Sequence, residues 1–232
     1  MDAFCGCGGD AIAFAKNPNV SLVVAIDTDF NKLRMASNNA RIYNIPSDKI
    51  IFLHANAIDC INRYQNGTFV PPPPSMDHTD KEEEEETKEQ LDRKEETQDT
   101  EICHGFPIGG IHLLPPLIDC IFLSPPWGGM EYLGVGMYDI QKGIHVSTND
   151  APNQQNDTTI DGETLLQYAM AASTDQNVIY FLPRNINGRS LARSALNGGY
   201  THGIFEMEQN VILGKTKTVT AYFGKLLQYA KL

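Results

Sequence analysis

Hydrophobic residues along the chain fall into short runs that alternate with amphipathic stretches. Four runs have the length and the apolar, β-branched character of buried strands, at 22–26, 50–53, 117–123 and 178–182. Three other stretches have the composition and spacing of helices, at 11–16, 31–43 and 165–172. Strands that alternate with helices predict a parallel sheet covered on both faces, because each crossover between parallel strands carries a helix.

The end of the chain has a different pattern. Two β-rich runs, 203–213 and 216–223, are separated by Gly214 and Lys215, which is the spacing of a tight hairpin. A hairpin there places an antiparallel strand on the sheet. We therefore predict an α/β fold with a Rossmann-like, doubly wound, mostly parallel sheet and a C-terminal antiparallel hairpin. In such folds, ligands bind at the carboxyl ends of the strands.

One segment interrupts the alternation. It opens with four consecutive prolines at 71–74 and continues through five consecutive glutamates at 82–86. Its like charges repel, and its few apolar residues bury too little surface to offset the entropy of ordering. We predict that residues 66–116 form a largely disordered, acidic insertion, and that 1–65 and 117–232 form one domain. The insertion is either plain surface or a docking segment for an unknown basic partner.

Most of the net charge of −11 over 232 residues belongs to that segment. Residues 77–101 hold 13 acidic and 4 basic side chains, which leaves 16 acidic and 14 basic ones elsewhere. A nearly neutral body does not exclude a nucleic-acid partner. Because no apolar run approaches about 20 residues and no leader is visible, we expect neither a membrane span nor a secretory signal. Five cysteines without Cys-x2-Cys spacing indicate reduced thiols and no metal site.

A glycine-rich turn precedes the first predicted helix. Residues 2–10 read DAFCGCGGD, and glycines at a strand-to-helix turn allow close backbone approach to a bound nucleotide or amino acid. Asp27 ends the hydrophobic run at 22–26, where a carboxylate can accept both hydroxyls of a ribose. Together these features indicate an adenosine-bearing cofactor, either a nicotinamide dinucleotide or S-adenosylmethionine. The alternative is a tight turn beside an exposed carboxylate.

A second motif distinguishes between those cofactors. Residues 124–129 read SPPWGG and follow the apolar run that ends at Leu123. Two prolines fix the loop, which then aims the Ser124 hydroxyl and the Pro125 carbonyl at one point beside the indole of Trp127. These groups offer two hydrogen-bond acceptors to an exocyclic amine and an aromatic surface on which the ring that carries the amine can stack. The loop resembles the (Asp/Asn/Ser)-Pro-Pro-aromatic loop of amino-methyltransferases; the alternative is a rigid turn with a packing tryptophan.

Further segments extend the resemblance to a single family. Residues 25–27 (AID), 180–185 (YFLPRN), 208–210 (EQN) and 217–224 (KTVTAYFG), together with both motifs, make the sequence similar to the trimethylguanosine synthase family. The similarity covers nearly all of the chain outside the insertion and residues 146–161. It implies the class I methyltransferase fold and S-adenosylmethionine as cofactor. The implied reaction is methyl transfer to the exocyclic N2 of the 7-methylguanosine cap of small nuclear and nucleolar RNAs, which gives the 2,2,7-trimethylguanosine cap.

The resemblance also implies roles for individual residues. The residues implied to position the reacting amine are Ser124, Pro125 and Trp127. Those implied to bind the cofactor are Asp2, Gly6, Gly8, Asp27 and Asn56, and no metal is implied. Those implied to bind the cap are Trp127, Asn39 and Arg184, the last by its bidentate fork on the triphosphate. A helix-surface asparagine and a surface salt bridge are the alternatives for Asn39 and Arg184.

The family pattern also contains a first strand and a helical extension ahead of the glycine-rich turn. Because the sequence starts at Met1, we expect exposed edges on the neighbouring strands and weakened cofactor binding. Asp10, and the segment Met130-Glu131-Tyr132, also depart from the family pattern. The competing hypotheses are an inactive cap-binding fragment and an amino-methyltransferase of internal RNA bases. The resemblance further implies a nuclear or nucleolar location, and we expect a monomer.

Overall fold

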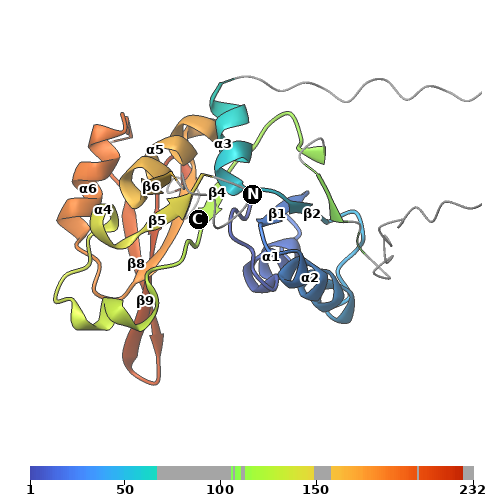
Figure 1. Ribbon diagram of the computed structural model, residues 1–232, viewed down its shortest axis with the longest axis horizontal. Coiled ribbons are helices and arrows are strands. Elements are labelled where there is room, and N and C mark those ends of the chain that lie inside the picture. Colours follow the sequence, from blue (N-terminus) through green and yellow to red (C-terminus); the bar gives the residue numbers. More distant parts are fainter. Residues whose placement is uncertain (67–105, 107, 111–112, 149–157, 203, 227–232) are drawn as a thin grey trace, which may run out of the picture.

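The computed structural model describes residues 1–66, 106, 108–110, 113–148, 158–202 and 204–226 (Figure 1). Its elements follow in the order α1 (Gly9–Ala15), β1 (Val23–Asp27), α2 (Phe30–Ile42), β2 (Ile50–His54), α3 (Ala57–Gln65), β3 (Ile108–Gly109), β4 (Ile121–Leu123), η2 (Gly129–Gly134), α4 (Ile140–Gly143), β5 (His145–Ser147), β6 (Thr159–Asp161), α5 (Gly162–Ala172), η3 (Thr174–Gln176), β7 (Val178–Pro183), α6 (Gly188–Asn197), β8 (Glu206–Ile212) and β9 (Lys215–Tyr222). The chain is therefore a mixed α/β protein, as the alternating pattern predicts.

The main sheet has two halves. In one half β1 pairs with β2 and β2 with β3, and all three strands are parallel. In the other, β4 pairs in parallel with β7, whereas β9 is antiparallel to both β7 and β8. Strands β5 and β6 form a separate antiparallel pair. The mostly parallel sheet and the antiparallel C-terminal hairpin are both confirmed.

Residues 1–5 join the two halves. Asp2 lies in parallel bridges to Ala25 of β1 and Phe122 of β4. On one side the Asp2 amide donates to Val24 O at 2.7 Å, and on the other Phe122 N donates to Met1 O at 2.8 Å. The expectation of open strand edges is corrected over this stretch, because short extended backbone pairs with both neighbours. The glycine-rich turn thus starts at the centre of the sheet, where the amino terminus lies in Figure 1.

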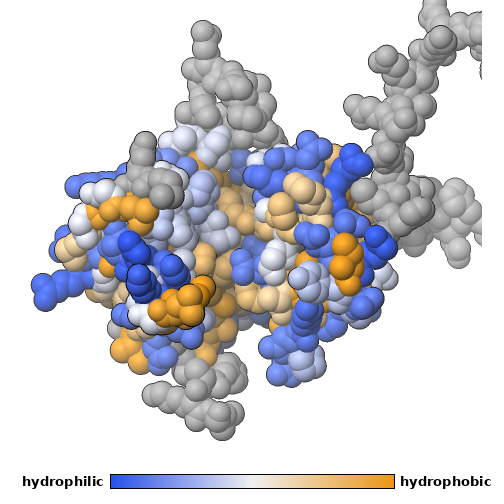
Figure 2. Space-filling model, turned by 90° about the horizontal axis from the view of Figure 1, so that it is seen from below, coloured by the Kyte–Doolittle hydropathy of each residue, from blue (hydrophilic) through white to orange (hydrophobic). Residues whose placement is uncertain are grey.

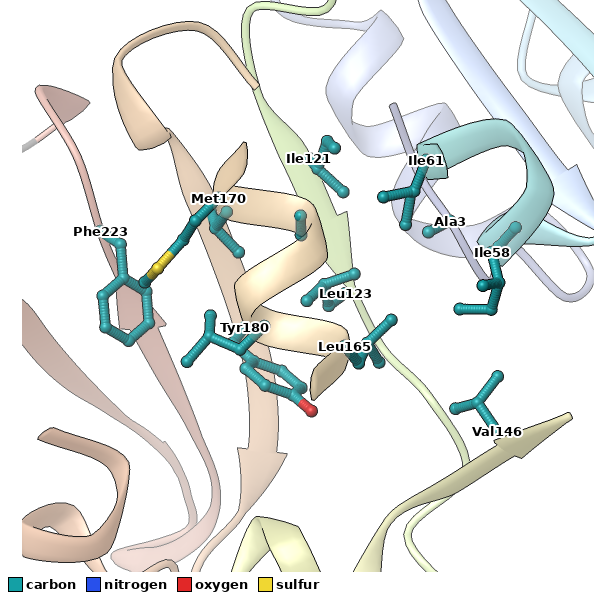
Figure 3. Close-up of a cluster of buried hydrophobic side chains, with 14 of the residues drawn as sticks. Ala3, Ile58, Ile61, Ile121, Leu123, Val146, Leu165, Met170, Tyr180 and Phe223 are labelled. Carbon is teal, nitrogen blue, oxygen red and sulfur yellow. The ribbon is translucent and has the colours of Figure 1, made fainter. Parts of the chain in front are cut away.

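Helices cover both faces of the sheet, and side chains of β1 alternate between the two buried clusters beneath them. Val24 and Ile26 belong to a buried cluster that also contains residues of α3, α5 and α6, whereas Val23 and Ala25 belong to one that contains residues of α1 and α2. Figure 3 shows the first cluster, in which the isoleucines of α3 face Ile121 and Leu123 of β4. Because both faces of the sheet are covered, Val23 to Ile26 are all buried, which explains why this strand is a continuous apolar run.

Most predicted elements are confirmed, with ends shifted by one to three residues. The exception is the strand predicted over 117–123, of which only β4 forms. Its first half leaves the sheet because Ile118 O accepts hydrogen bonds from the amide and hydroxyl of Thr174 instead. Helices α3 and α6 were not predicted; their N-caps, Asn56 and Asn187, accept from amides of the first turn and mark both starts.

The hairpin turn lies at Leu213 and Gly214, one residue before the predicted position. Both residues have positive φ, 51° and 73°, which is the pattern of a type I′ turn. In Figure 1 the hairpin projects from the body, and Figure 2 looks onto that end of the molecule, where hydrophobic residues lie among hydrophilic ones. Leu213 is 96% exposed at the tip.

Part of the segment predicted as an insertion is described. Strand β3 pairs with β2, and Phe106 is buried with its ring edge-on to Phe52, 5.8 Å between centroids. The acidic stretch 77–101 lies outside the described residues, so its disorder and the domain boundaries stay predictions. No helix within the described ranges is long and apolar enough to cross a membrane.

Candidate active site at the carboxyl ends of the strands

The glycine-rich turn is shaped by two residues with positive φ. Gly6 (52°) and Gly8 (85°) adopt the left-handed backbone that glycine tolerates, and Gly8 is also the N-cap of α1. A Cβ on Gly8 would lie 2.9 Å from the Cβ of Ala36, so α2 packs directly against the turn. A Cβ on Gly6 would meet nothing within 4 Å, so the backbone there is open to a ligand.

Asp27 holds this turn from the end of β1. Its Oδ2 accepts from Gly6 N at 2.9 Å, and its Oδ1 accepts from Asp29 N at 2.8 Å. Each carboxylate oxygen has two lone pairs, so each keeps one acceptor position after these bonds. A half-buried carboxylate that is fixed in this way is suited to accept the two hydroxyls of a ribose, as the sequence predicts.

Asp2 places a second carboxyl group beneath the turn. The side chain is fully buried; Oδ1 accepts from Phe4 N at 3.4 Å, and Oδ2 has no hydrogen-bond partner among the described residues. Burial, assisted by the negative charge of Asp10, raises the pKa of Asp2 to about 7. An unpartnered buried carboxyl oxygen next to open glycine backbone fits a cationic ligand group.

The tryptophan loop, residues 124–138, meets the glycine-rich turn at Ser124. The Ser124 hydroxyl donates to the Phe4 carbonyl at 3.3 Å, and Pro125 is buried behind it. Because the hydroxyl has one proton, this bond turns its oxygen lone pairs toward other donors. The Ser124 oxygen therefore has lone pairs available to accept hydrogen bonds beside the glycine-rich turn.

Trp127 is half-buried and held in a fixed orientation. Its indole Nε1 donates to Phe181 O at 3.2 Å, and its ring lies 5.3 Å from the Phe181 ring at an interplanar angle of 39°. Tyr132 packs edge-on to the indole, at 5.8 Å and 87°. These contacts leave a rigid aromatic plate beside Ser124.

Hydrogen bonds to the segment after β7 hold the rest of the tryptophan loop. Asn185 Nδ2 donates to Tyr132 O at 3.0 Å and to Val135 O at 2.7 Å. Tyr138 Oη donates to Trp127 O at 3.1 Å, and burial raises the pKa of Tyr138 to about 12, which keeps this donor protonated. The backbone of Tyr138 also pairs with Asn185 and Asn187.

Comparison with known proteins agrees with this geometry. The sequence model of the family described as RNA cap guanine-N2 methyltransferase matches residues 1–226. The chain belongs to this family. It is 27% identical over 227 residues to trimethylguanosine synthase of Schizosaccharomyces pombe, which covers 97% of this chain and 64% of that protein. The chain thus spans just under two thirds of the length of this curated relative.

The remaining residues expected to act in an RNA cap guanine-N2 methyltransferase lie around the same strand ends. Asn39 of α2 donates from Nδ2 to Cys7 O at 2.9 Å, which ties the helix to the glycine-rich turn. Arg184 is exposed directly after β7. Asn56 follows β2, but its Oδ1 accepts from Ile58 N at 2.8 Å and its Nδ2 donates to Ser147 O at 3.1 Å. These contacts give Asn56 a structural task, and the predicted ligand contacts of all three residues stay predictions.

Sequence reasoning missed the supports of the site. The carbonyl of Phe4 orients Ser124 and the carbonyl of Phe181 orients Trp127. The side-chain amide of Asn185 holds the backbone of the tryptophan loop. All three supports belong to segments that carry the family resemblance. No signal in a single sequence marks a backbone carbonyl as functional. Within the described part of the chain, no group of three or more histidine, cysteine or acidic residues is arranged to hold a metal ion.

Proposed function

We propose that this protein transfers methyl groups from S-adenosylmethionine to the exocyclic N2 of the 7-methylguanosine RNA cap and so forms the 2,2,7-trimethylguanosine cap. The observation that carries the proposal is the hydrogen bond that the Ser124 hydroxyl donates to Phe4 O, which leaves its oxygen lone pairs available to accept from an amine. It lies between the glycine-rich turn and the fixed indole of Trp127. Membership of the RNA cap guanine-N2 methyltransferase family supports the same substrate.

The cofactor fits the residues around the glycine-rich turn. S-adenosylmethionine supplies an electrophilic methyl group on a sulfonium. Asp27 would accept the ribose hydroxyls, Gly6 and Gly8 would let the backbone approach the methionine part, and Asp2 would offer its unpartnered oxygen to a cationic group. The expected acceptor role of Asn56 toward the adenine amine would use a lone pair of Oδ1 left after the helix cap.

For an in-line methyl transfer, the main task of the protein is positioning. The lone pair of guanine N2 is delocalised into the ring, so the amine is a weak nucleophile. Hydrogen bonds from its two N–H groups to Ser124 Oγ and to the Pro125 carbonyl would orient the amine and stabilise the positive charge that develops on nitrogen. No strong base is required before attack, because the cationic nitrogen releases its proton after methyl transfer.

Recognition of the cap is assigned to aromatic and cationic groups beside this amine. Trp127 would stack on 7-methylguanine, whose positive charge adds a cation–π attraction to about 1–3 kcal/mol of base stacking. Arg184, exposed after β7, would engage oxygens of the triphosphate in a bidentate way. Asn39 would contact the guanine from α2.

The wider setting follows from the same proposal. We infer a Rossmann-like, doubly wound class I methyltransferase fold, supported by helices on both faces and by the position of the site at the strand ends. The substrates would be small nuclear and nucleolar RNAs, the location the nucleus or nucleolus, and the active form a monomer. The acidic segment 77–101 would offer a docking site to a basic partner.

A methyl-transfer assay with radiolabelled S-adenosylmethionine tests the proposal directly. A 7-methylguanosine cap dinucleotide should accept label at N2, whereas the unmethylated dinucleotide and an uncapped RNA should not. Calorimetry on the same protein should show cofactor binding. A folded protein that binds the cofactor but labels the uncapped RNA instead would favour an internal-base methyltransferase, and binding of the cap without transfer would favour a cap-binding protein.

A further inference from the structure

The tryptophan loop is attached almost entirely to the end of one strand. The indole Nε1 of Trp127 donates to Phe181 O within β7, and further along the loop Asn185 Nδ2 donates to two carbonyls. Tyr138 closes the loop through its backbone, donating to Asn185 O at 2.8 Å and accepting from Asn187 N at 2.8 Å. The loop therefore follows any movement of residues 181–187.

The Asn185 side chain suits this task chemically. Both protons of its Nδ2 are used, at 3.0 Å to Tyr132 O and at 2.7 Å to Val135 O. Its Oδ1 is buried without a partner among the described residues, so the side chain acts only as a double donor. A carboxylate of the same shape would face two carbonyl oxygens with no proton to share, and alanine would leave both carbonyls unpaired.

Asn185 also directly follows Arg184, the residue assigned to the cap triphosphate. The backbone of Asn185 is fixed by Tyr138 N, while its side chain fixes Tyr132 and Val135. Asn185 thus links Trp127, which would stack on the base, to Arg184, which would bind the phosphates. A ligand that spans both needs this spacing to be correct before it binds.

We propose that Asn185 is a positioning residue that sets the distance between Trp127 and Arg184 and so couples recognition of the cap base to recognition of its triphosphate. This inference rests on the proposed function. It predicts that loss of Asn185 weakens cap binding without affecting the cofactor, whose expected ligands lie on the other half of the sheet and at the central turn. A side chain needed only for folding would weaken both equally.

The test compares two ligands by quenching of Trp127, the only tryptophan of the chain, without cofactor. With 7-methylguanosine monophosphate, Asn185→Ala should raise Kd about 3- to 30-fold, the effect of losing one or two hydrogen bonds. With the cap dinucleotide, the wild type should bind more tightly than with the monophosphate. In Asn185→Ala the ratio of the monophosphate Kd to the dinucleotide Kd should fall toward the ratio measured for Arg184→Ala, because the Arg184 guanidinium is no longer aligned with the base.

Two further variants make the result interpretable. Tyr138→Phe removes only the hydroxyl that donates to Trp127 O, and it should raise Kd for the monophosphate about 2- to 10-fold even if Asn185→Ala folds poorly. Asn177→Ala is the matched control, since Asn177 Nδ2 donates to Asp119 O at 3.1 Å and its Oδ1 is buried without a partner among the described residues, but it lies at the amino end of β7, opposite the site, and should change neither ligand. Calorimetry should give S-adenosylmethionine Kd values within about twofold for all variants.

The outcomes separate the two proposals. A wild-type protein that binds neither cap ligand refutes the proposed function itself. A wild type that binds both, with Asn185→Ala unchanged in Kd and in the dinucleotide advantage, overturns only the positioning role. Equal losses of cap and cofactor affinity in Asn185→Ala would also overturn it, because they would reduce the residue to a support of the fold.

Discussion

Replacing Asp2 with asparagine removes a buried carboxyl group whose pKa is raised from 3.8 to about 7, chiefly by burial. Between these two values the folded protein keeps a proton that the unfolded chain releases. The free energy of unfolding contributed by this group therefore falls as pH rises from about 4 to about 7 and is constant above that. One pH unit corresponds to about 1.4 kcal/mol, so roughly three units set a ceiling of about 4 kcal/mol.

Asparagine does not titrate, so the stability of the Asp2→Asn protein relative to the wild type should increase across the same pH window. We expect the difference in free energy of unfolding, Asp2→Asn minus wild type, to rise by about 2–4 kcal/mol between pH 4.5 and 7.5. Urea denaturation of both proteins at several pH values measures it, and the other titrating groups cancel in the subtraction. Asp10→Asn should reduce the wild-type slope, because the charge of Asp10 is the second cause of the shift. A difference that stays constant with pH would refute the reasoning, since it would mean that Asp2 is already ionised in the folded protein.

The same carboxyl group links cofactor binding to protons. A cationic group placed at the unpartnered Oδ2 favours the ionised form, so binding near pH 6.5 should release up to about one proton. Calorimetry of S-adenosylmethionine binding in two buffers of different ionisation enthalpy measures that number. The wild type should release a proton and Asp2→Asn should release none; equal values would place the cofactor cation away from Asp2.

Three further predictions use single substitutions. Gly8→Ala should lower stability by about 1–3 kcal/mol because of its φ of 85° and the 2.9 Å approach to Ala36, whereas Gly9→Ala, with open space around its Cβ, should change Tm little; equal losses in thermal melts would contradict this. Ser124→Ala should slow methyl transfer about 10- to 100-fold with cap affinity nearly unchanged, and a rate within twofold of the wild type would remove Ser124 from the mechanism. Trp127→Ala should weaken cap binding by about 1–3 kcal/mol in a competition assay, and retention of full affinity would exclude stacking on this residue.

The sequence predicted those elements in which local pattern and tertiary environment agree. The run at 22–26 forms most of β1 because Val23 to Ile26 are each buried on one face or the other, and α2 forms with Leu33, Ala36 and Ala40 buried along one side. The run at 117–123 is equally apolar, yet Leu117 is 63% exposed and only its second half pairs. That difference depends on Thr174, more than 50 residues away, so no local pattern contains it.

The candidate site residues stay predictions, and they rest on different kinds of argument. Asp27, Gly6 and Ser124 were predicted because their side-chain chemistry, or the lack of a side chain, suits a task at a strand end. Asn56 was assigned to the cofactor by its position after the second strand, and that contact stays a prediction; its helix cap and its bond to Ser147 O are structural roles that the sequence analysis did not predict. One supporting contact of Trp127 is the backbone carbonyl of Phe181 in β7, whose position depends on strand order and not on residue type.

The five residues between β1 and β4 also determine how the protein can open. If the sheet separates into cooperative units, the boundary runs along the backbone of Met1 to Cys5, where few hydrogen bonds join the two halves. The amide protons of Ile26 and Phe122, which bond to this stretch, would then exchange with solvent together and ahead of those within each half. Since the same stretch leads into the glycine-rich turn, a ligand bound at that turn would slow exchange on both sides at once.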